Sequence, residues 1–184
     1  MTHSRRLTVL LTAMTLVLVT PIAATAKPVS SYTLTHTQSS GLQTTSFELT
    51  LDEAGNGTLH FDHISFELID CGDEIGSRTS TASYDGQVTS DEFSLDRKLS
   101  SFVWSGAVEV ETEVTTSCSD AGLQVGPTAV AWDFSVVGTA SDRLGRTRVD
   151  GARVLSSTLD DLTVEIDGSS YNGVGLLQET ISRG

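Results

Sequence analysis

The sequence predicts a single all-β domain, built as an antiparallel β-sandwich, with a closed β-barrel as the alternative. Three observations lead to this prediction. Apolar and polar residues alternate in several windows, clusters of Gly, Asp and Ser separate these windows, and no stretch of about eleven residues after position 26 has a helical period. About eight to ten short strands fit between the turns, and a domain with that many strands forms a sandwich or a barrel.

The first 26 residues predict a secretory signal peptide. Arg5 and Arg6 give a basic start, residues 7–19 form an apolar run interrupted only by threonines, and residues 24–26 read Ala-Thr-Ala. This order is typical of a signal peptide cleaved after Ala26, and the apolar run is too short for a membrane span, which needs about 20 residues. We therefore expect residues 27–184 to be a secreted, single-domain protein with no membrane span.

The charge of the chain excludes one class of partner. The sequence has 11 basic and 24 acidic residues, a formal net charge of −13. Nucleic-acid binding relies on clustered Lys and Arg that displace counterions from phosphates, so we expect no nucleic-acid partner. The 38% hydrophobic content is enough for one ordinary core, which argues against disorder.

The first predicted hairpin is centred on a turn at residues 52–57. Asn56-Gly57 lies between alternating runs and favours a tight turn, since both residues tolerate positive φ. Asn56-Gly57-Thr58 is also a glycosylation sequon, but the turn alone explains it. The alternating apolar residues on the two sides are Phe47, Leu49, Leu51, Leu59 and Phe61.

Directly after this hairpin the apolar phase shifts by one residue, to Ile64, Phe66 and Leu68. A bulge or turn near residues 62–63 would explain the shift, because a regular strand keeps alternate side chains on one face.

The histidines of the mature chain are His36, His60 and His63. In a regular strand His60 and Asp62 share a face, while His63 points the opposite way. A metal site would need the bulge described above, so we expect surface or turn histidines and no metal.

The longest alternating window covers residues 101–115. Glu109, Glu111 and Glu113 fall on one face of it, about 7 Å apart. They are a candidate cation or Ca²⁺ patch, or a platform for a basic partner; the alternative is a solvated surface. The opposite face carries Phe102, Trp104, Val108, Val110 and Val114. Later windows repeat the pattern at Val130, Trp132, Phe134 and Val136, and at Leu162, Val164 and Ile166.

Cys71 and Cys118 are the two cysteines of the chain. Their spacing fits neither a C-x-x-C redox motif nor a zinc motif, and export would place them in an oxidising compartment. We therefore expect one structural disulfide, which the loop-entropy model values at roughly 4 kcal/mol.

Arg143, Arg146, Arg148 and Arg153 concentrate basic charge within one short stretch. They are a candidate patch for an anion, an acidic polymer or a partner. The simpler alternative, which we favour, pairs them with the glutamates of residues 109–113.

Catalytic motifs are absent from the sequence. It has no G-x-S-x-G elbow and no Gly-rich phosphate loop, and nothing in it calls for a cofactor. The acidic pairs Asp73-Glu74, Asp91-Glu92 and Asp160-Asp161 fall in predicted loops, where such pairs are usually solvated. We expect no catalytic residues and a non-enzymatic protein.

One resemblance adds to this interpretation. Residues 93–99 read Phe-Ser-Leu-Asp-Arg-Lys-Leu, the long alternating window follows, and residues 130–134 read Val-Ala-Trp-Asp-Phe, with Gly138 after them. This order resembles small secreted β-rich proteins of actinobacteria with no assigned activity, although no Trp-Thr-Gly follows the strand that contains residues 130–134. The resemblance implies export and an all-β fold, and no site residues.

These observations favour an extracellular binding or cell-envelope-associated module, whose partner is a cell-wall polymer or another protein. Two alternatives stay open. One is a carrier of a small apolar ligand, with a cavity lined by Trp104, Trp132 and Phe134. The other is a polysaccharide hydrolase that uses the loop carboxylates.

Overall fold

The computed structural model describes residues 28–118, 125–141 and 144–182. These residues form an antiparallel all-β fold, as predicted, without helices in the described part. The predicted signal segment, residues 1–26, lies outside the described residues, as does Arg143. The strands are β1 Val29–Ser40, β2 Gln43–Leu51, β3 Gly57–Asp70, β4 Ile75–Val88, β5 Glu92–Leu95, β6 Ser101–Thr116, β7 Val125–Thr139, β8 Gly145–Val149, β9 Ala152–Ile166 and β10 Ser169–Ser182.

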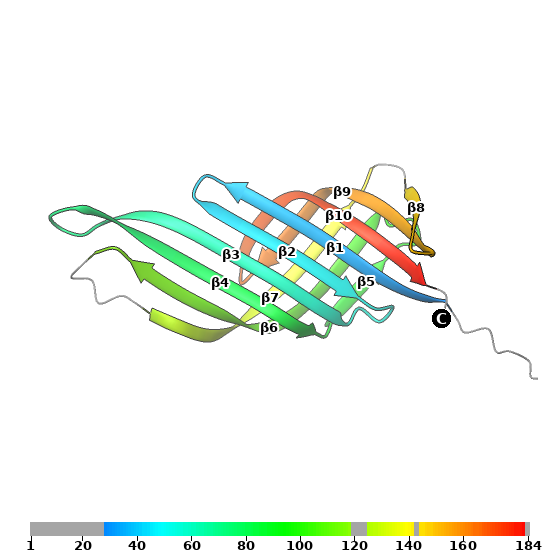
Figure 1. Ribbon diagram of the computed structural model, residues 1–184, viewed down its shortest axis with the longest axis horizontal. Helices are drawn as coiled ribbons and strands as arrows, with labels where there is room; N and C mark the ends of the chain where they lie inside the picture. The colour runs from blue at the N-terminus through cyan, green and yellow to red at the C-terminus, as the bar shows by residue number, and fades with distance from the viewer. Residues whose placement is uncertain (1–27, 119–124, 142–143, 183–184) are drawn as a thin grey trace, which may run out of the picture.

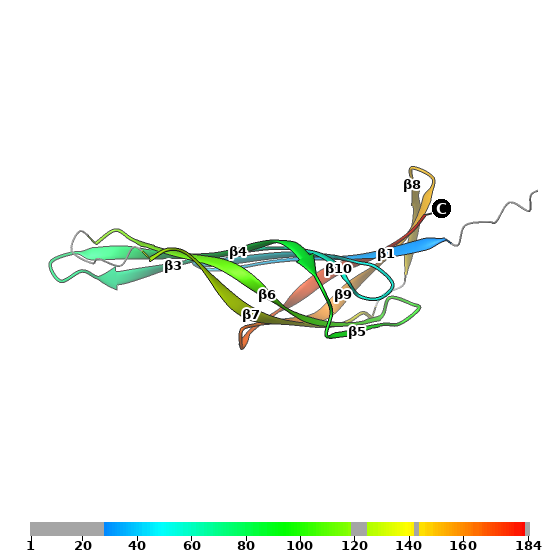
Figure 2. The same cartoon turned by 90° about the horizontal axis from the view of Figure 1, so that it is seen from below.

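The strands form two packed layers, as expected for a sandwich-like fold. β1 to β4 run along one side of the molecule and β5 along the other; β6 starts beside β5 and crosses to the first side, where Glu111–Thr116 pair with β4 (Figures 1 and 2). Pairing follows the order β10-β1-β2-β3-β4-β6-β7-β9-β8, with β5 on β6, and β9 also pairs with β10. The two layers therefore share hydrogen bonds along both edges, which combines the packing of a sandwich with the closed pairing of the alternative.

Large apolar side chains fill the space between the layers. Phe61 of β3 meets Phe134 of β7 with ring centroids 5.2 Å apart, which ties the two layers together. Trp104 of β6 is fully buried, and its indole N–H donates to the backbone oxygen of Gly55, 3.0 Å away. Buried apolar area is the main favourable term in folding, so these contacts hold the layers in place.

The long alternating window is confirmed as strand β6. Phe102, Trp104, Val108 and Val110 are buried, and the three glutamates lie on the opposite face. Successive side chains of a strand point to opposite faces, so the register that buries these apolar residues also exposes the three glutamates.

The predicted hairpin is present, but its turn differs from the expected Asn-Gly turn. The left-handed residue is Gly55, with φ of 82°, and Asp52 accepts hydrogen bonds from the backbone N–H of Ala54 and Asn56 at 2.8 and 3.0 Å. Gly57 already belongs to β3, opposite Leu51. A Cβ at Gly57 would clash with the backbone oxygen of Thr50, so this position needs glycine for close approach.

Candidate functional site

The β3–β4 hairpin extends past its neighbour β2. β2 stops pairing with β3 at Gln43 and Ser65, whereas β3 and β4 stay paired to Asp70 and Ile75. The hairpin therefore reaches the end of the molecule opposite β8 (Figure 1).

A disulfide holds this hairpin in place. Cys71 bonds to Cys118, just after β6, with the Cα atoms 5.6 Å apart, as the sequence predicts. Ser117 adds two hydrogen bonds to Ser77 of β4: its Oγ accepts from the Ser77 N–H at 2.8 Å, and its own N–H donates to the Ser77 oxygen at 2.9 Å. The tip is thus anchored to β6 although β2 does not reach it.

The apolar phase shift after Phe61 turns out to be a change of face. Register between β3 and both neighbours is continuous from Gly57 onward, so the expected bulge is absent from this strand. Phe61 points into the core, and Ile64, Phe66 and Leu68 point outward. These three side chains are 47%, 38% and 64% exposed.

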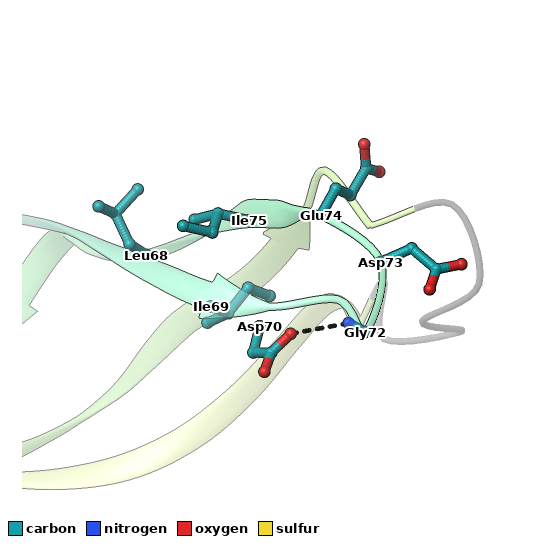
Figure 3. A pocket seen from close by; sticks show the side chains of 7 residues that line it. All are labelled: Leu68, Ile69, Asp70, Gly72, Asp73, Glu74 and Ile75. Carbon is teal, nitrogen blue, oxygen red and sulfur yellow. Dashed lines mark hydrogen bonds between the residues drawn. The ribbon is translucent and has the colours of Figure 1, made fainter.

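We call this outward surface the apolar stripe and define it as Ile64, Phe66 and Leu68 of β3 with Ile75 of β4. Ile75 is 78% exposed and lies opposite Asp70, on the same face as the β3 residues. Figure 3 shows Leu68 and Ile75 on one face of the hairpin, with the side chains of Asp73 and Glu74 directed outward from the turn. A shallow hollow of about 570 Å³ lies here.

The glutamates predicted from the sequence adjoin the apolar stripe. Glu113 shares a cross-strand row with Ile64, with Thr81 of β4 between them. Glu111 lies one row further, next to Ser83, on the same outward face. The outer face of β3, β4 and β6 therefore presents apolar side chains beside carboxylates.

A polar groove of about 430 Å³ continues this face toward the middle of the molecule, and its lining includes His60, Glu109 and Glu111. His60 and Asp62 share a face, as predicted, with Nε2 and Oδ2 3.0 Å apart; Nδ1 lies 3.8 Å from Asp85 Oδ2. Within the described ranges no group of three or more His, Cys, Asp or Glu could hold a metal ion.

The other two histidines correct the expectation of surface histidines. His36 is 4% exposed, and its Nδ1 lies 2.9 Å from the Val174 oxygen. His63 points inward and its Nδ1 is 2.9 Å from the hydroxyl of Thr45. Burial lowers the pKa of His63, because desolvation disfavours the charged imidazolium. The sequence placed His63 on the opposite face from His60 but did not show that this face is covered.

Arg146, Arg148 and Arg153 lie on the β8–β9 hairpin, which follows β6 and β7 in the sequence. Arg148 is directly opposite Arg153, and Arg146 is opposite Leu155. The favoured pairing with the glutamates is not seen: the ion pairs found among the described residues join His60 to Asp62 and Asp85, and Arg78 to Glu67.

The three acidic pairs do not come together. Asp73 and Glu74 lie in the β3–β4 turn, Asp91 and Glu92 at the start of β5, and Asp160 and Asp161 within β9. Asp160 accepts hydrogen bonds from the N–H and the hydroxyl of Ser141, which lower the pKa of that carboxyl.

The aromatic residues of the carrier alternative are packed against their neighbours. Trp104 is buried and hydrogen-bonded, and Phe134 and Trp132 both meet the ring of Phe61 edge-on.

Comparison with known proteins adds no relative: no family model matches the chain, and no curated protein or solved structure matches it either.

The sequence did not identify the apolar stripe as a surface. Its signal in the sequence is the phase shift at Ile64, which a bulge or turn would also explain.

Proposed function

We propose that residues 27–184 form an extracellular, non-enzymatic binding module, exported by the signal segment 1–26, that attaches to a component of the cell envelope. The apolar stripe carries this proposal. Four large apolar side chains gather on one outward face, although the same strand buries its apolar residues only a few positions earlier. Exposed contiguous apolar surface is typical of interaction sites.

The surroundings of the stripe favour a partner that offers both apolar and basic groups. Glu113 adjoins Ile64 in the same row, and Asp70, Asp73 and Glu74 surround the far end. Carboxylates at the rim of an apolar patch steer a basic partner and oppose an acidic one.

The hairpin is also suited to binding without large rearrangement. The Cys71–Cys118 bond and the Ser77–Ser117 hydrogen bonds restrain the tip before any partner arrives. A preorganised surface loses less conformational entropy on binding.

Two further observations support an extracellular, non-enzymatic role. A disulfide is typical of oxidising compartments. The acidic pairs of the hydrolase alternative lie in three separate places. Of the aromatic residues of the carrier alternative, Trp104 and Phe134 are buried in the core and Trp132 is partly buried against it. As a separate finding, the described ranges contain no helix long and apolar enough to span a membrane.

Co-sedimentation of purified residues 27–184 with cell-wall sacculi from the producing organism tests this proposal. We expect wild-type protein to pellet with sacculi without releasing soluble glycan. Phe66→Ser/Leu68→Ser should weaken binding about tenfold or more, since anchor residues of an interface carry most of the affinity. Val137→Ser, at an exposed apolar position on β7, is the matched control. Equal binding by both variants, or glycan turnover, would contradict the proposal.

A further inference from the structure

Two open strand edges lie at opposite ends of the molecule. β8 pairs only with β9 among the described strands, so its other side is open. The end of β3 beyond Ser65 pairs with β4 alone, because β2 stops there. Figure 1 shows the β3–β4 tip at one end of the long axis and β8 near the other. An open edge presents unpaired N–H and C=O groups, to which another strand can add.

On β3 the backbone groups that face the open edge belong to alternate residues. The N–H of Phe66 points toward β2, since it donates to the Leu42 oxygen at 2.8 Å. The N–H of Cys71 points toward β4, since it donates to the Glu74 oxygen at 2.9 Å. By alternation, the N–H and C=O of Leu68 and Asp70 face the open edge.

The same reasoning assigns the open groups of β8. Asp150 and Gly151 form a two-residue turn in which both have positive φ, 48° and 84°, so Val149 and Ala152 are the hydrogen-bonded closing pair. Arg146 and Arg148 therefore direct their backbone groups away from β9, toward the open edge.

The two edges carry opposite charge. The β3–β4 tip carries Glu67, Asp70, Asp73 and Glu74, and the β8–β9 hairpin carries Arg146, Arg148 and Arg153. Arg148 and Arg153 are directly opposite each other in a non-hydrogen-bonded pair, where Cα atoms are only about 4.5 Å apart. Like charges in that position are destabilising, so this hairpin is suited to an approaching anionic group.

We propose that β8 of one copy adds to the open edge of β3 of the next copy, antiparallel, and that the protein assembles head to tail. The pairing that matches the open backbone groups and opposes charges places Arg146 opposite Asp70 and Arg148 opposite Leu68. The two surfaces are different and lie at opposite ends, so the contact is heterologous and does not close on itself.

Net charge does not prevent this contact. Without Arg5 and Arg6, residues 27–184 have 9 basic and 24 acidic residues and a formal charge of −15, but at physiological ionic strength charges are screened beyond about 8 Å. Attractions between Arg146 and Asp70 act over a shorter distance than this, so they outweigh the screened repulsion between the bodies of the two copies. High salt should weaken them, which distinguishes this contact from apolar aggregation.

Head-to-tail assembly would multiply the surface described above. It uses the edge of β3, whereas the proposed function uses its outer face, so either can fail without the other. A chain of copies presents many apolar stripes, and multivalent attachment raises avidity without any new contact.

Sedimentation velocity of residues 27–184, from about 10 µM to about 1 mM, tests the assembly. We expect species that grow with concentration and dissociate in about 0.5 M NaCl. Asp70→Lys and Arg146→Glu/Arg148→Glu should each be monomeric, the first lacking the acidic edge and the second the basic edge. Mixed together, they should assemble again in one-to-one proportion, because the unchanged edges still match and each charge-reversed edge meets an edge of opposite charge on the other variant. Arg97→Glu/Lys98→Glu, a charge-matched change at exposed positions, should assemble like wild type.

Asp70 also accepts from the Gly72 N–H at 2.8 Å, so Asp70→Asn, which keeps an acceptor oxygen, serves if Asp70→Lys misfolds; it should weaken assembly about tenfold. A wild-type monomer at every concentration would overturn the proposal, as would a mixture that stays monomeric. If the arginine variant loses only its binding to sacculi while wild type stays monomeric, the basic edge binds an anionic wall polymer instead, and self-assembly is wrong.

Discussion

At the scale of single residues, environment decides what each side chain does. Trp104 and Phe66 are both aromatic residues in strands, yet one is fully buried and hydrogen-bonded to Gly55, and the other is exposed on the hairpin. His60 lies between two carboxylates at the surface, and His63 lies on a covered face beside Thr45. In each pair, the position of the residue relative to the two layers, and not its type, decides whether its side chain is covered or exposed.

Trp104→Ala should lower the free energy of unfolding by about 3–5 kcal/mol, because it leaves a cavity and removes the partner of the Gly55 oxygen. Urea denaturation followed by circular dichroism measures this. Val137→Ala, at an exposed position, is the control and should change stability by less than about 0.5 kcal/mol. Similar losses in both variants would mean that Trp104 is not part of the core.

His63 should make stability depend on pH. Burial lowers its folded pKa below the ordinary 6.5, so in the interval between the two values the unfolded chain binds more protons. Stability is therefore complete above about pH 6.5 and falls as the pH drops below it toward the folded pKa. Urea midpoints between pH 7.5 and 5 should show this fall, and His63→Gln should flatten it. Equal slopes for the two proteins would exclude this histidine as the source.

At the scale of elements, the β2–β3 and β3–β4 hairpins depend on different constraints. In the first, Gly57 allows β3 to pass against the Thr50 carbonyl. In the second, a disulfide substitutes for the missing neighbour strand at the tip. The β2–β3 pairing therefore depends on a glycine at position 57, and the β3–β4 tip depends on a covalent bond to the end of β6.

Gly57→Ala should destabilise the fold by about 1–3 kcal/mol, because the added methyl group must displace backbone. Gly126→Ala is the matched control, since a Cβ there meets no atom within 4 Å. Thermal unfolding of the two variants provides the comparison, and equal melting temperatures would show that the close approach at Gly57 relaxes freely.

Removing the disulfide should cost roughly 4 kcal/mol in unfolding free energy and should loosen the tip first. In Cys71→Ser/Cys118→Ser, hydrogen exchange should quicken most at residues 66–77, where β2 gives no support. Uniform acceleration along the whole chain would mean that the bond stabilises the molecule only globally.

At the scale of the whole molecule, secretion and disulfide formation can be tested on the exported protein. Secretion requires that residues 1–26 be removed, and the intact mass of the exported protein checks this. We expect the mass of residues 27–184 less two hydrogens, with no thiol reacting with iodoacetamide under denaturing conditions. A mass that includes the first 26 residues, or two alkylated thiols, would contradict secretion by this signal or the disulfide, respectively.

The sequence by itself determined the fold class, the alternation of β6, the hairpin around residues 52–57 and the cysteine pair. These follow from local rules: a strand repeats every two residues, turns need particular residues, and two cysteines allow one intramolecular pairing. The tertiary structure alone decided that Ile64 and Phe66 face water, that His36 is covered, and that Arg146, Arg148 and Arg153 form no ion pair with the glutamates of β6. The physical reason is that exposure and charge pairing depend on contacts between strands far apart in the sequence. Ile64 is paired on both sides, with Thr44 and Thr81, and is exposed because no layer covers its face.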